Sequence, residues 1–383
     1  MGRLIKGFPP LETIQYELEN YPHIALDKAT RTVLNECSAA LAMGCDGIAY
    51  NAFANVEGSL AEYEPLLDGI AADRAVWEAL VESASGLPPV GLWPAHSSAL
   101  MAERDVDDNG WFWEGDRYDV HKPNELFEMG IPLTPDPEAA CGTILAGKIA
   151  EAFSTDELTR LLSQGVLMDA AALEVLWTRG LGQWTGVRLA EAVPPAVSER
   201  FTDHPLNGAD AGGGRYATFG TNEGTYRLLP IADGVGDLSH LASLDGTDRG
   251  CCLSTYTNPL GGRVAVSSYA PWRQLGRAAK RRQIIAVANW ISRGHLPARI
   301  DETVRVAPFV RASEDGSRIV VLLLNTALDP TGPLTLRLAT KVGAIVQTTA
   351  SGSSPLPVER SEDGLKVAVP SIPAWQTLLL IGR

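Results

Sequence analysis

The sequence predicts a multidomain α/β protein that ends in a small antiparallel β-domain. Three observations indicate this fold class. The chain has 383 residues, and single cores stop growing at ~250–300 residues. Strand-like and helix-like segments alternate before about residue 300. Short strand-like segments separated by turn residues follow after it. We therefore expect parallel βα structure first and antiparallel structure last.

The first domain, residues 1–84, has the pattern of two βα units. Residues 11–20 alternate as a strand, 26–43 have helical periodicity, 47–53 form a second strand, and 64–83 form a second helix. This spacing predicts a parallel pair with a right-handed crossover. Two units cannot cover both faces of a parallel sheet. They must borrow strands from the next domain, pair with another polypeptide, or be the end of a barrel whose first strands are absent.

The second domain, residues 85–299, contains further βα steps. The helix at 155–163 begins with a capping box, in which Ser154 is followed three residues later by Glu157. A region at about 190–262 is rich in glycine and aspartate and predicts inserted strands and loops. The alternation favours a doubly wound sheet, with strands expected at 90–93, 144–146, 166–169 and 263–269, and helices at 124–129, 170–179 and 276–291.

The third domain, residues 300–383, shows no helical pattern. Five short strands are expected there, and they predict a small antiparallel β-domain. The expected strands are residues 304–310, 318–325, 334–338, 365–369 and 376–381.

Composition and charge exclude several classes of function. The formal net charge is −14, so nucleic acid and anionic membranes would be repelled. No stretch reaches the ~18 apolar residues of a membrane-spanning helix, and no signal peptide is evident at the start, so we expect a cytoplasmic protein. The 5 cysteines and 6 histidines are scattered without metal-ligand spacing, so neither a metal nor another cofactor is expected.

Three polar side chains share one face of the first strand. The period of two in a strand places Gln15, Glu17 and Glu19 together. In a parallel barrel this face points inward, where an unpaired carboxylate is costly, and Glu19 lies at the carboxyl end, where barrels carry catalytic groups. An ordinary exposed edge strand with solvated carboxylates would give the same spacing, so both interpretations stay open.

Two longer phrases carry a family resemblance. Glu17-Leu18-Glu19-Asn20-Tyr21-Pro22 followed by Gly44-Cys45-Asp46-Gly47-Ile48-Ala49-Tyr50-Asn51 resembles the last two barrel strands of glycoside hydrolase family 42 and its β-galactosidase-like relatives. Ser163-Gln164-Gly165-Val166-Leu167-Met168-Asp169 is similar to a pattern in the domain that follows the barrel in that family. The order of the domains agrees with the same architecture.

The resemblance implies three structural parts. They are the last two βα units of a TIM barrel, a class I glutamine-amidotransferase-like (flavodoxin-like) trimerisation domain, and a C-terminal antiparallel β-sandwich. No Cys/His set for glutaminase chemistry is recognisable, so the middle domain is expected to be a scaffold. Its partner would be a second and third copy of the chain, or a polypeptide that supplies the rest of the barrel.

The resemblance also implies site residues. The family's nucleophile falls on Glu19, with Glu17 as the second choice, and Asn51 falls at a substrate-binding position. The acid/base of the family comes from a fourth barrel strand in an Asn-Glu pair. Neither Asn35-Glu36 nor Asn222-Glu223 replaces it. The chain is therefore expected to be a part of a retaining glycosidase that is inactive alone, or a non-catalytic carbohydrate-binding or oligomerisation protein.

Two further segments suggest ligand contacts. Trp111 and Trp113 lie in a polar stretch among aspartates, and such side chains stack on sugars, although packing against the protein's own core is the more ordinary role of tryptophan. Lys280-Arg281-Arg282 is a basic run that we interpret as a solvated helix face.

Overall fold

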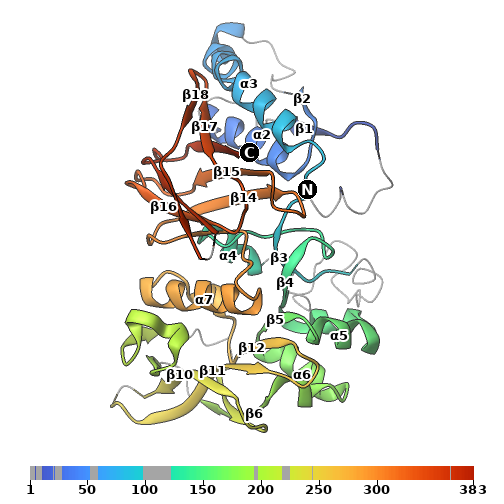
Figure 1. Ribbon diagram of the computed structural model, residues 1–383, viewed down its shortest axis with the longest axis vertical. Helices are drawn as coiled ribbons and strands as arrows, with labels where there is room; N and C mark the ends of the chain where they lie inside the picture. Colours follow the sequence, from blue (N-terminus) through green and yellow to red (C-terminus); the bar gives the residue numbers. More distant parts are fainter. Residues whose placement is uncertain are drawn as a thin grey trace. The chain divides into compact units, whose positions relative to one another are not determined.

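The computed structural model describes residues 5, 11–19, 21, 28–51, 59–97, 122–193, 197–217, 225–243, 245–362 and 364–383 (Figure 1). The chain divides into two compact units. Unit 1 comprises residues 1–91, 127–139 and 297–383, and unit 2 comprises residues 92–126 and 140–296. The division into domains at residues 84 and 299 stays a prediction. Among the described residues, no helix is long and apolar enough to span a membrane.

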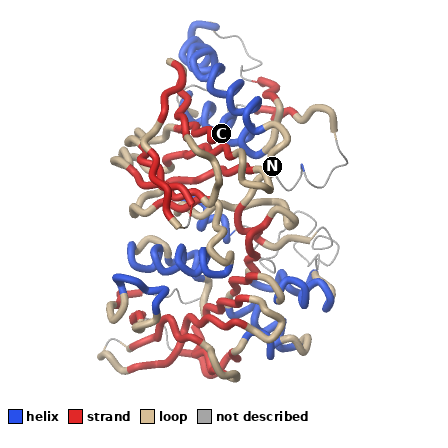
Figure 2. The backbone as a smooth tube through the Cα atoms, in the orientation of Figure 1, coloured by secondary structure: helices blue, strands red, loops and turns tan. Residues whose placement is uncertain are grey.

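Unit 1 begins with a parallel βαβα segment. Strand β1 (Gln15–Glu19) pairs in parallel with β2 (Gly47–Asn51) through the crossover helix α2 (Thr30–Met43). Helix α3 (Glu64–Ala84) follows β2 after a short 3-10 turn. The two strands and two helices expected from the sequence are all present, with somewhat different ends. In Figure 2 these helices are blue and these strands are red, near the top of the view.

The residues from Gly44 to Gly47, which join α2 to β2, each have a structural context that explains them. Gly44 ends α2 with φ 115°, a left-handed conformation that glycine adopts without strain. Asp46 then joins the starts of the two strands: its backbone N–H donates to the Ile14 carbonyl at 2.7 Å, and its Oδ2 accepts from the Ile14 N–H at 3.0 Å. These contacts fix the register of β2 against β1.

The C-terminal part of unit 1 is sandwich-like and contains two antiparallel sheets. One has the order β14-β15-β21-β17-β18 and the other β13-β16-β20-β19. The strands are β13 (Ala298–Ile300), β14 (Val306–Ala312), β15 (Ile319–Asn325), β16 (Leu334–Leu338), β17 (Ile345–Thr349), β18 (Gly352–Pro355), β19 (Val358–Ser361), β20 (Gly364–Val369) and β21 (Thr377–Gly382). The sequence predicted five of these strands and missed β13, β17, β18 and β19.

Strand β15 is buried on both faces, which explains its continuous apolar run. Val320 and Leu322 pack with the core of α2 and α3, whereas Ile319, Val321 and Leu323 pack with the other sheet. The helices therefore lie between the β1–β2 pair and the five-stranded sheet, and a single core joins these layers.

Unit 2 is built on a mixed eight-stranded sheet with the order β3-β4-β5-β12-β11-β10-β7-β8. Its strands are β3 (Gly91–Pro94), β4 (Ala140–Leu145), β5 (Gly165–Met168), β12 (Arg263–Ser267), β11 (Asp248–Thr257), β10 (Gly236–Ala242), β7 (Val197–Phe201) and β8 (Gly214–Ala217). Strands β4, β5 and β12 are parallel, and every pair from β12 to β8 is antiparallel. The doubly wound sheet expected from the sequence is thus present only in its parallel part.

Helices cover both faces of the parallel strands. Helices α5 (Thr155–Leu162) and α6 (Ala170–Thr178) share a core with Val166 and Met168, and α7 (Ala278–Ile291) packs where Gly165 faces it. A Cβ at Gly165 would lie 2.1 Å from the Ile291 carbonyl oxygen, so only glycine fits. The predicted capping box at Ser154 and Glu157 is confirmed. Unit 2 also contains the antiparallel pair β6 (Val187–Val193) and β9 (Thr225–Pro230), and the short helix α4 (Glu125–Glu128) spans the division between the units.

His240, on the antiparallel strand β10 of unit 2, makes the free energy of unfolding depend on pH. His240 contacts Asp248 through Nδ1 at 2.9 Å and Asp237 through Nε2 at 3.4 Å. The hydrogen bond with Asp237, then that with Asp248, outweighs burial and raises the pKa of His240 to about 9.

Because this pKa lies above the ordinary histidine value, the stabilisation is complete below pH ~6.5 and is lost as the pH rises through about 9. We expect urea denaturation to show a loss of roughly 1 kcal/mol over this window, since the imidazole is 28% exposed and solvent screens the pairs. A His240→Gln variant should lose this pH dependence. An unchanged slope in the variant would contradict the assignment.

Candidate functional site

The predicted catalytic carboxylates lie on the open face of the β1–β2 pair. Leu18 is fully buried against the helices, whereas Gln15, Glu17 and Glu19 are exposed. The alternation arises because successive side chains of a strand point to opposite faces. The side that carries Tyr16 and Leu18 therefore packs on the core, and the carboxylates project away from it.

The register places Asn51 beside Glu19. In the parallel pair Glu19 is opposite Asn51, and Glu17 is opposite Ala49. Both Glu19 and Asn51 end their strands and are exposed. The structure thus brings together two of the residues selected from the sequence, at the carboxyl end where parallel βα folds position ligand-binding groups.

Glu17 and Glu19 cannot form a catalytic pair by themselves. Their Cα atoms are about 6.6 Å apart along one strand, and both side chains project from the same face. A retaining glycosidase needs two carboxyl groups ~5–5.5 Å apart that flank the scissile bond. Any partner for Glu19 must therefore come from a different strand facing it.

The other sequence candidates contribute nothing to this face in the described structure. Trp111, Trp113 and the pair Asn222-Glu223 lie outside the described residues. Asn35 is buried in α2, where its Nδ2 donates to the Trp375 carbonyl at 3.1 Å. Asn35 therefore has a structural contact, which joins α2 to the segment before β21.

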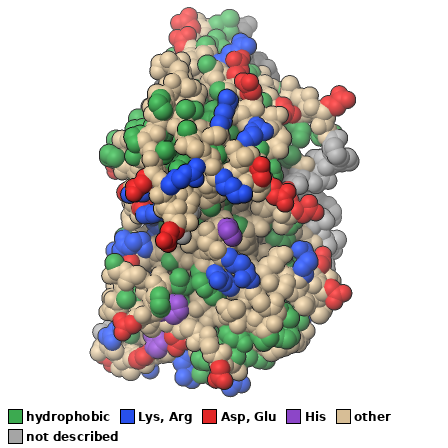
Figure 3. Space-filling model, in the orientation of Figure 1, with side chains coloured by type: hydrophobic (Ala, Val, Ile, Leu, Met, Phe, Trp, Pro, Cys, Tyr) green, Lys and Arg blue, Asp and Glu red, His purple; other side chains and the backbone are tan. Residues whose placement is uncertain are grey.

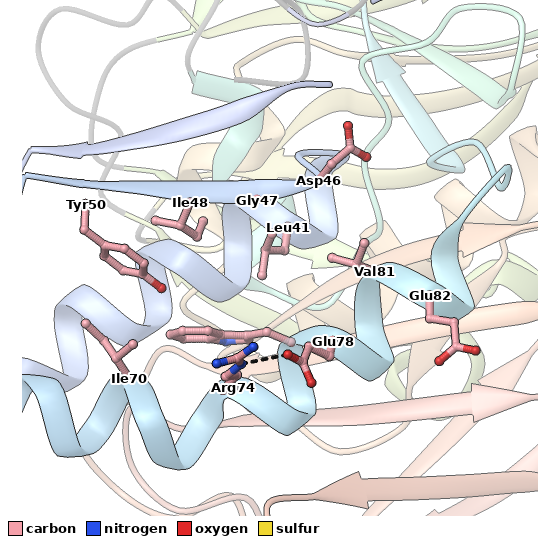
Figure 4. A pocket seen from close by; sticks show the side chains of 11 residues that line it. Leu41, Asp46, Gly47, Ile48, Tyr50, Ile70, Arg74, Glu78, Val81 and Glu82 are labelled. Carbon is pink, nitrogen blue, oxygen red and sulfur yellow. Dashed lines mark hydrogen bonds and ion pairs between the residues drawn. The ribbon is translucent and has the colours of Figure 1, made fainter. Parts of the chain in front are cut away.

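A groove of about 720 Å³ lies on the opposite side of β2, between this strand and α3 (Figure 4). Its floor and walls are mostly apolar and include Ile48, Ile70 and Val81. In Figure 4 the aromatic ring of Tyr50 extends from β2 toward α3. This groove could not be predicted from the sequence, because it depends on how α3 packs against β2.

A buried ionic cluster in unit 2 was also missed. Glu199 of β7 is completely buried and accepts hydrogen bonds from Lys280 Nζ at 2.9 Å and Arg215 Nε at 2.6 Å. The Tyr269 hydroxyl donates to both carboxylate oxygens at 3.0 and 2.9 Å, and Ser239 Oγ donates at 2.5 Å. The carboxylate is thus surrounded by donors from β8, β10, α7 and the segment after β12.

The electrostatics of this cluster favour the ionised carboxylate. Burial alone would raise the pKa of Glu199, but the charges of Lys280 and Arg215 and the hydrogen bonds lower it to about 2. Burial also lowers the pKa of Lys280, against the opposing effect of Glu199. Because all these side chains are inaccessible, the cluster holds the sheet and helix together and is not a ligand site.

The interpretation of Lys280-Arg281-Arg282 as a solvated face was wrong for its first two members. Lys280 is 0% and Arg281 1% exposed, and Arg282 is the exposed residue, paired with Asp210 at 2.7 Å. Helical periodicity was an available signal. Lys280 is four residues before Ile284, which is buried, so it lies on the apolar face of α7.

Potential metal ligands are dispersed among the described residues. Within the described ranges, no group of three or more His, Cys, Asp or Glu residues is arranged to hold a metal. Cys141 of β4 is desolvated, and burial raises its pKa to about 12. A thiol with a pKa raised in this way is a poor nucleophile at neutral pH.

On the face drawn in Figure 3, basic and acidic side chains are interspersed, with several Lys and Arg side chains near the middle of the view.

Comparison of the sequence with protein-family models and with curated proteins gives no match. Several solved structures are similar to the structure of this chain. An α-L-fucosidase isoenzyme 2 from Paenibacillus thiaminolyticus matches with TM-score 0.62 and 12% identity over 93% of this chain and 57% of that chain. A β-galactosidase from Bacillus circulans sp. alkalophilus matches with TM-score 0.53 and 13% identity over 93% and 52%. A GH42 β-galactosidase, Gan42B, matches with TM-score 0.52 and 11% identity over 93% and 51%.

The chain therefore has a glycoside hydrolase-like fold, mixed α/β with several sheets and a β-sandwich-like part. It spans 51–57% of the length of these three structures. At 11–13% identity the likeness concerns the fold.

Proposed function

We propose that this chain supplies the nucleophile of a retaining, β-galactosidase-like glycoside hydrolase, and that Glu19 is that nucleophile. The observation that carries the proposal is the position of Glu19, exposed at the carboxyl end of a parallel strand and opposite Asn51 in the register. The family 42 resemblance and the glycoside hydrolase-like fold support the same assignment. Carbohydrate is the expected substrate class.

In this proposal β1, α2, β2 and α3 are the last two βα units of a TIM barrel. The open face that carries Glu19 would line the barrel interior. The parallel part of unit 2 would be the amidotransferase-like domain, and trimer formation through it is a part of the proposal. The acid/base would come from strands supplied by another polypeptide or by a longer form of the protein, so the chain alone would be inactive.

The two carboxyl groups have different roles in the reaction: Glu19 is the nucleophile and the other group is the acid/base. An oxygen of Glu19 attacks the anomeric carbon while the acid/base donates its proton to the glycosidic oxygen, and the bond to the leaving group breaks. Water then attacks the glycosyl ester, the acid/base takes the proton of that water, and Glu19 is released as a carboxylate. Asn51, beside Glu19, is suited to hydrogen-bond a sugar hydroxyl next to the reacting carbon.

Hydrolysis of 4-nitrophenyl β-D-galactoside tests this function. The purified 383-residue chain should show no turnover. Adding the polypeptide encoded immediately upstream, which should contain the remaining βα units, should restore it. If no such reading frame exists, or if the mixture stays inactive on a panel of aryl glycosides, the non-catalytic carbohydrate-binding or oligomerisation alternative is favoured. Turnover by the chain alone would contradict the missing acid/base.

A further inference from the structure

Two exposed apolar side chains lie on neighbouring loops at one end of the sandwich-like part of unit 1. Trp375 is 38% exposed in the loop before β21, and Leu328 is 81% exposed in the loop after β15. Buried Asn325, at the end of β15, ties these loops together. Its Nδ2 donates to the Asp329 carbonyl at 2.8 Å in one loop and to the Pro373 carbonyl at 3.0 Å in the other. The two exposed side chains therefore belong to one fixed surface.

The backbone of Trp375 has a conformation that large side chains rarely adopt. Its φ is 51°, in the left-handed region that favours glycine because a Cβ is crowded there. The Gln376 N–H donates to the Pro373 carbonyl at 3.3 Å across the turn. In addition, Nδ2 of buried Asn35 in α2 donates to the Trp375 carbonyl at 3.1 Å. Strained residues persist only where the surrounding structure imposes them, and they cluster at functional sites.

Another exposed tryptophan shows what is unusual about Trp375. Trp177 of α6 is also 38% exposed, but its Nε1 donates to the Val187 carbonyl at 3.1 Å and its ring lies against Gly182. Trp177 thus has a structural role. The indole of Trp375 makes no hydrogen bond with any residue that the structure describes. Exposing an indole gives up the stabilisation that burial of its apolar surface would provide, so packing alone does not explain Trp375.

Trp375 lies across the helix layer from the proposed catalytic face. Because it precedes β21 of the five-stranded sheet, it approaches α2 from the side away from the face that carries Glu19. Helix α2 begins at Thr30, after the carboxyl end of β1, and Asn35 is about 7.5 Å along its axis from that start. The Trp375 surface is therefore separate from Glu19 but lies toward the same end of the βαβα segment.

The chemistry of this surface fits a sugar ring. An exposed indole face can stack on the apolar C–H face of a pyranose, and Leu328 extends the apolar contact. Asp329, next to Leu328, is exposed, and its carboxylate can accept hydrogen bonds from hydroxyl groups. Stable protein–protein interfaces bury roughly 1,200–2,000 Å², far more than two side chains supply. A saccharide is thus a better fit than a protein partner.

We infer that Trp375, with Leu328 and Asp329 beside it, is a carbohydrate-binding platform that is distinct from the catalytic face. The class of ligand rests on the proposed function, in which carbohydrate is the substrate, whereas the location of the platform does not. The indole stacks on one pyranose of a β-linked galactan, and Asp329 accepts hydrogen bonds from its hydroxyl groups. Holding a polymer in this way raises the local concentration of its other sugars near the protein.

Affinity electrophoresis in gels that contain a soluble, β-linked galactan tests the platform. The full chain should be retarded, and Trp375→Gly should bind the galactan at least about tenfold more weakly. Because glycine adopts φ 51° without strain, the urea midpoint of Trp375→Gly should equal or exceed that of the unsubstituted chain. Trp375→Tyr keeps an aromatic face and should retain most of the retardation.

Three further variants sharpen the test. Trp177→Leu is the matched control, since it removes an equally exposed indole, and it should leave the retardation unchanged. Leu328→Ser should weaken binding several-fold without affecting the turn that holds Trp375. Glu19→Gln should also leave the retardation unchanged, because the platform is separate from the catalytic face.

Four outcomes overturn the inference. They are absence of retardation of the unsubstituted chain, equal retardation of Trp375→Gly, a lower urea midpoint of Trp375→Gly, which would make the indole a packing group, and self-association that Trp375→Gly abolishes, which would make the surface a protein interface. Failure of the catalytic proposal gives a different result. The galactan would then still retard the chain, while the complemented enzyme hydrolyses no glycoside.

Discussion

Replacing Glu199 with glutamine is expected to lower the free energy of unfolding by about 3–5 kcal/mol. The substitution keeps the volume of the side chain but leaves Lys280 and Arg215 buried without their carboxylate. Glu199 is 0% exposed and receives donors from both cations, Tyr269 and Ser239. Removing one member of a buried ionic cluster lowers the free energy of unfolding by much more than the intact cluster contributes to it. Urea denaturation at pH 7, followed by far-UV circular dichroism, measures the change.

The pH dependence of this effect has a definite sign. The folded pKa of Glu199 is about 2, below the ordinary glutamate value of 4.5. Its contribution is therefore present above pH ~4.5 and is lost as the pH falls through about 2. The stability difference between the unsubstituted chain and Glu199→Gln should shrink between these values.

A matched control is available beside the cluster, where Asp210 contacts α7. Asp210 pairs with Arg282, two residues from Lys280, and the Arg282 side chain is 47% exposed. Asp210→Asn should cost no more than about 1 kcal/mol, because solvent screens the pair. A Glu199→Gln effect as small as that of Asp210→Asn would show that the cluster contributes little to stability.

Replacing Glu19 with glutamine in the complemented enzyme is expected to reduce kcat by about 10³-fold or more. Loss of a covalent nucleophile removes the two-step route, and residual rate comes from binding and electrostatic stabilisation. Glu17→Gln is the matched control, since Glu17 lies on the same exposed face two residues away. It should change kcat by less than about tenfold.

Chemical rescue separates a catalytic role from a structural one. In a Glu19→Ala variant, azide can occupy the space of the carboxylate and attack the anomeric carbon. Turnover should recover with azide and yield a glycosyl azide of inverted configuration. Rescue of a Glu17→Ala variant instead would move the nucleophile to Glu17, and rescue of neither would leave the nucleophile unassigned on this strand.

The βαβα segment of unit 1 could be predicted because its signals are local. Alternation in 11–20 and 47–53, helical periodicity, and Gly44 as the helix end all act within a few residues of one another. The capping box at Ser154 is equally local. The strand period correctly placed Gln15, Glu17 and Glu19 on one face, whereas the position of Glu19 opposite Asn51 comes from the register that the structure shows.

The features that the sequence did not predict depend on distant contacts. Strands β18 and β19 are exposed and lack apolar alternation, so their strand structure comes from pairing with β17 and β20. Lys280 was interpreted as solvated because its carboxylate partner, Glu199, lies 81 residues earlier in the chain. Only the fold brings these two residues together.

The central claim is that Glu19 forms the covalent intermediate, and trapping that intermediate tests it most directly. The complemented enzyme is inactivated with 2,4-dinitrophenyl 2-deoxy-2-fluoro-β-D-galactoside, digested and mapped by mass spectrometry. We predict a single 2-fluorogalactosyl ester on Glu19. A label on Glu17, on a residue of unit 2 or on the complementing polypeptide alone would contradict it.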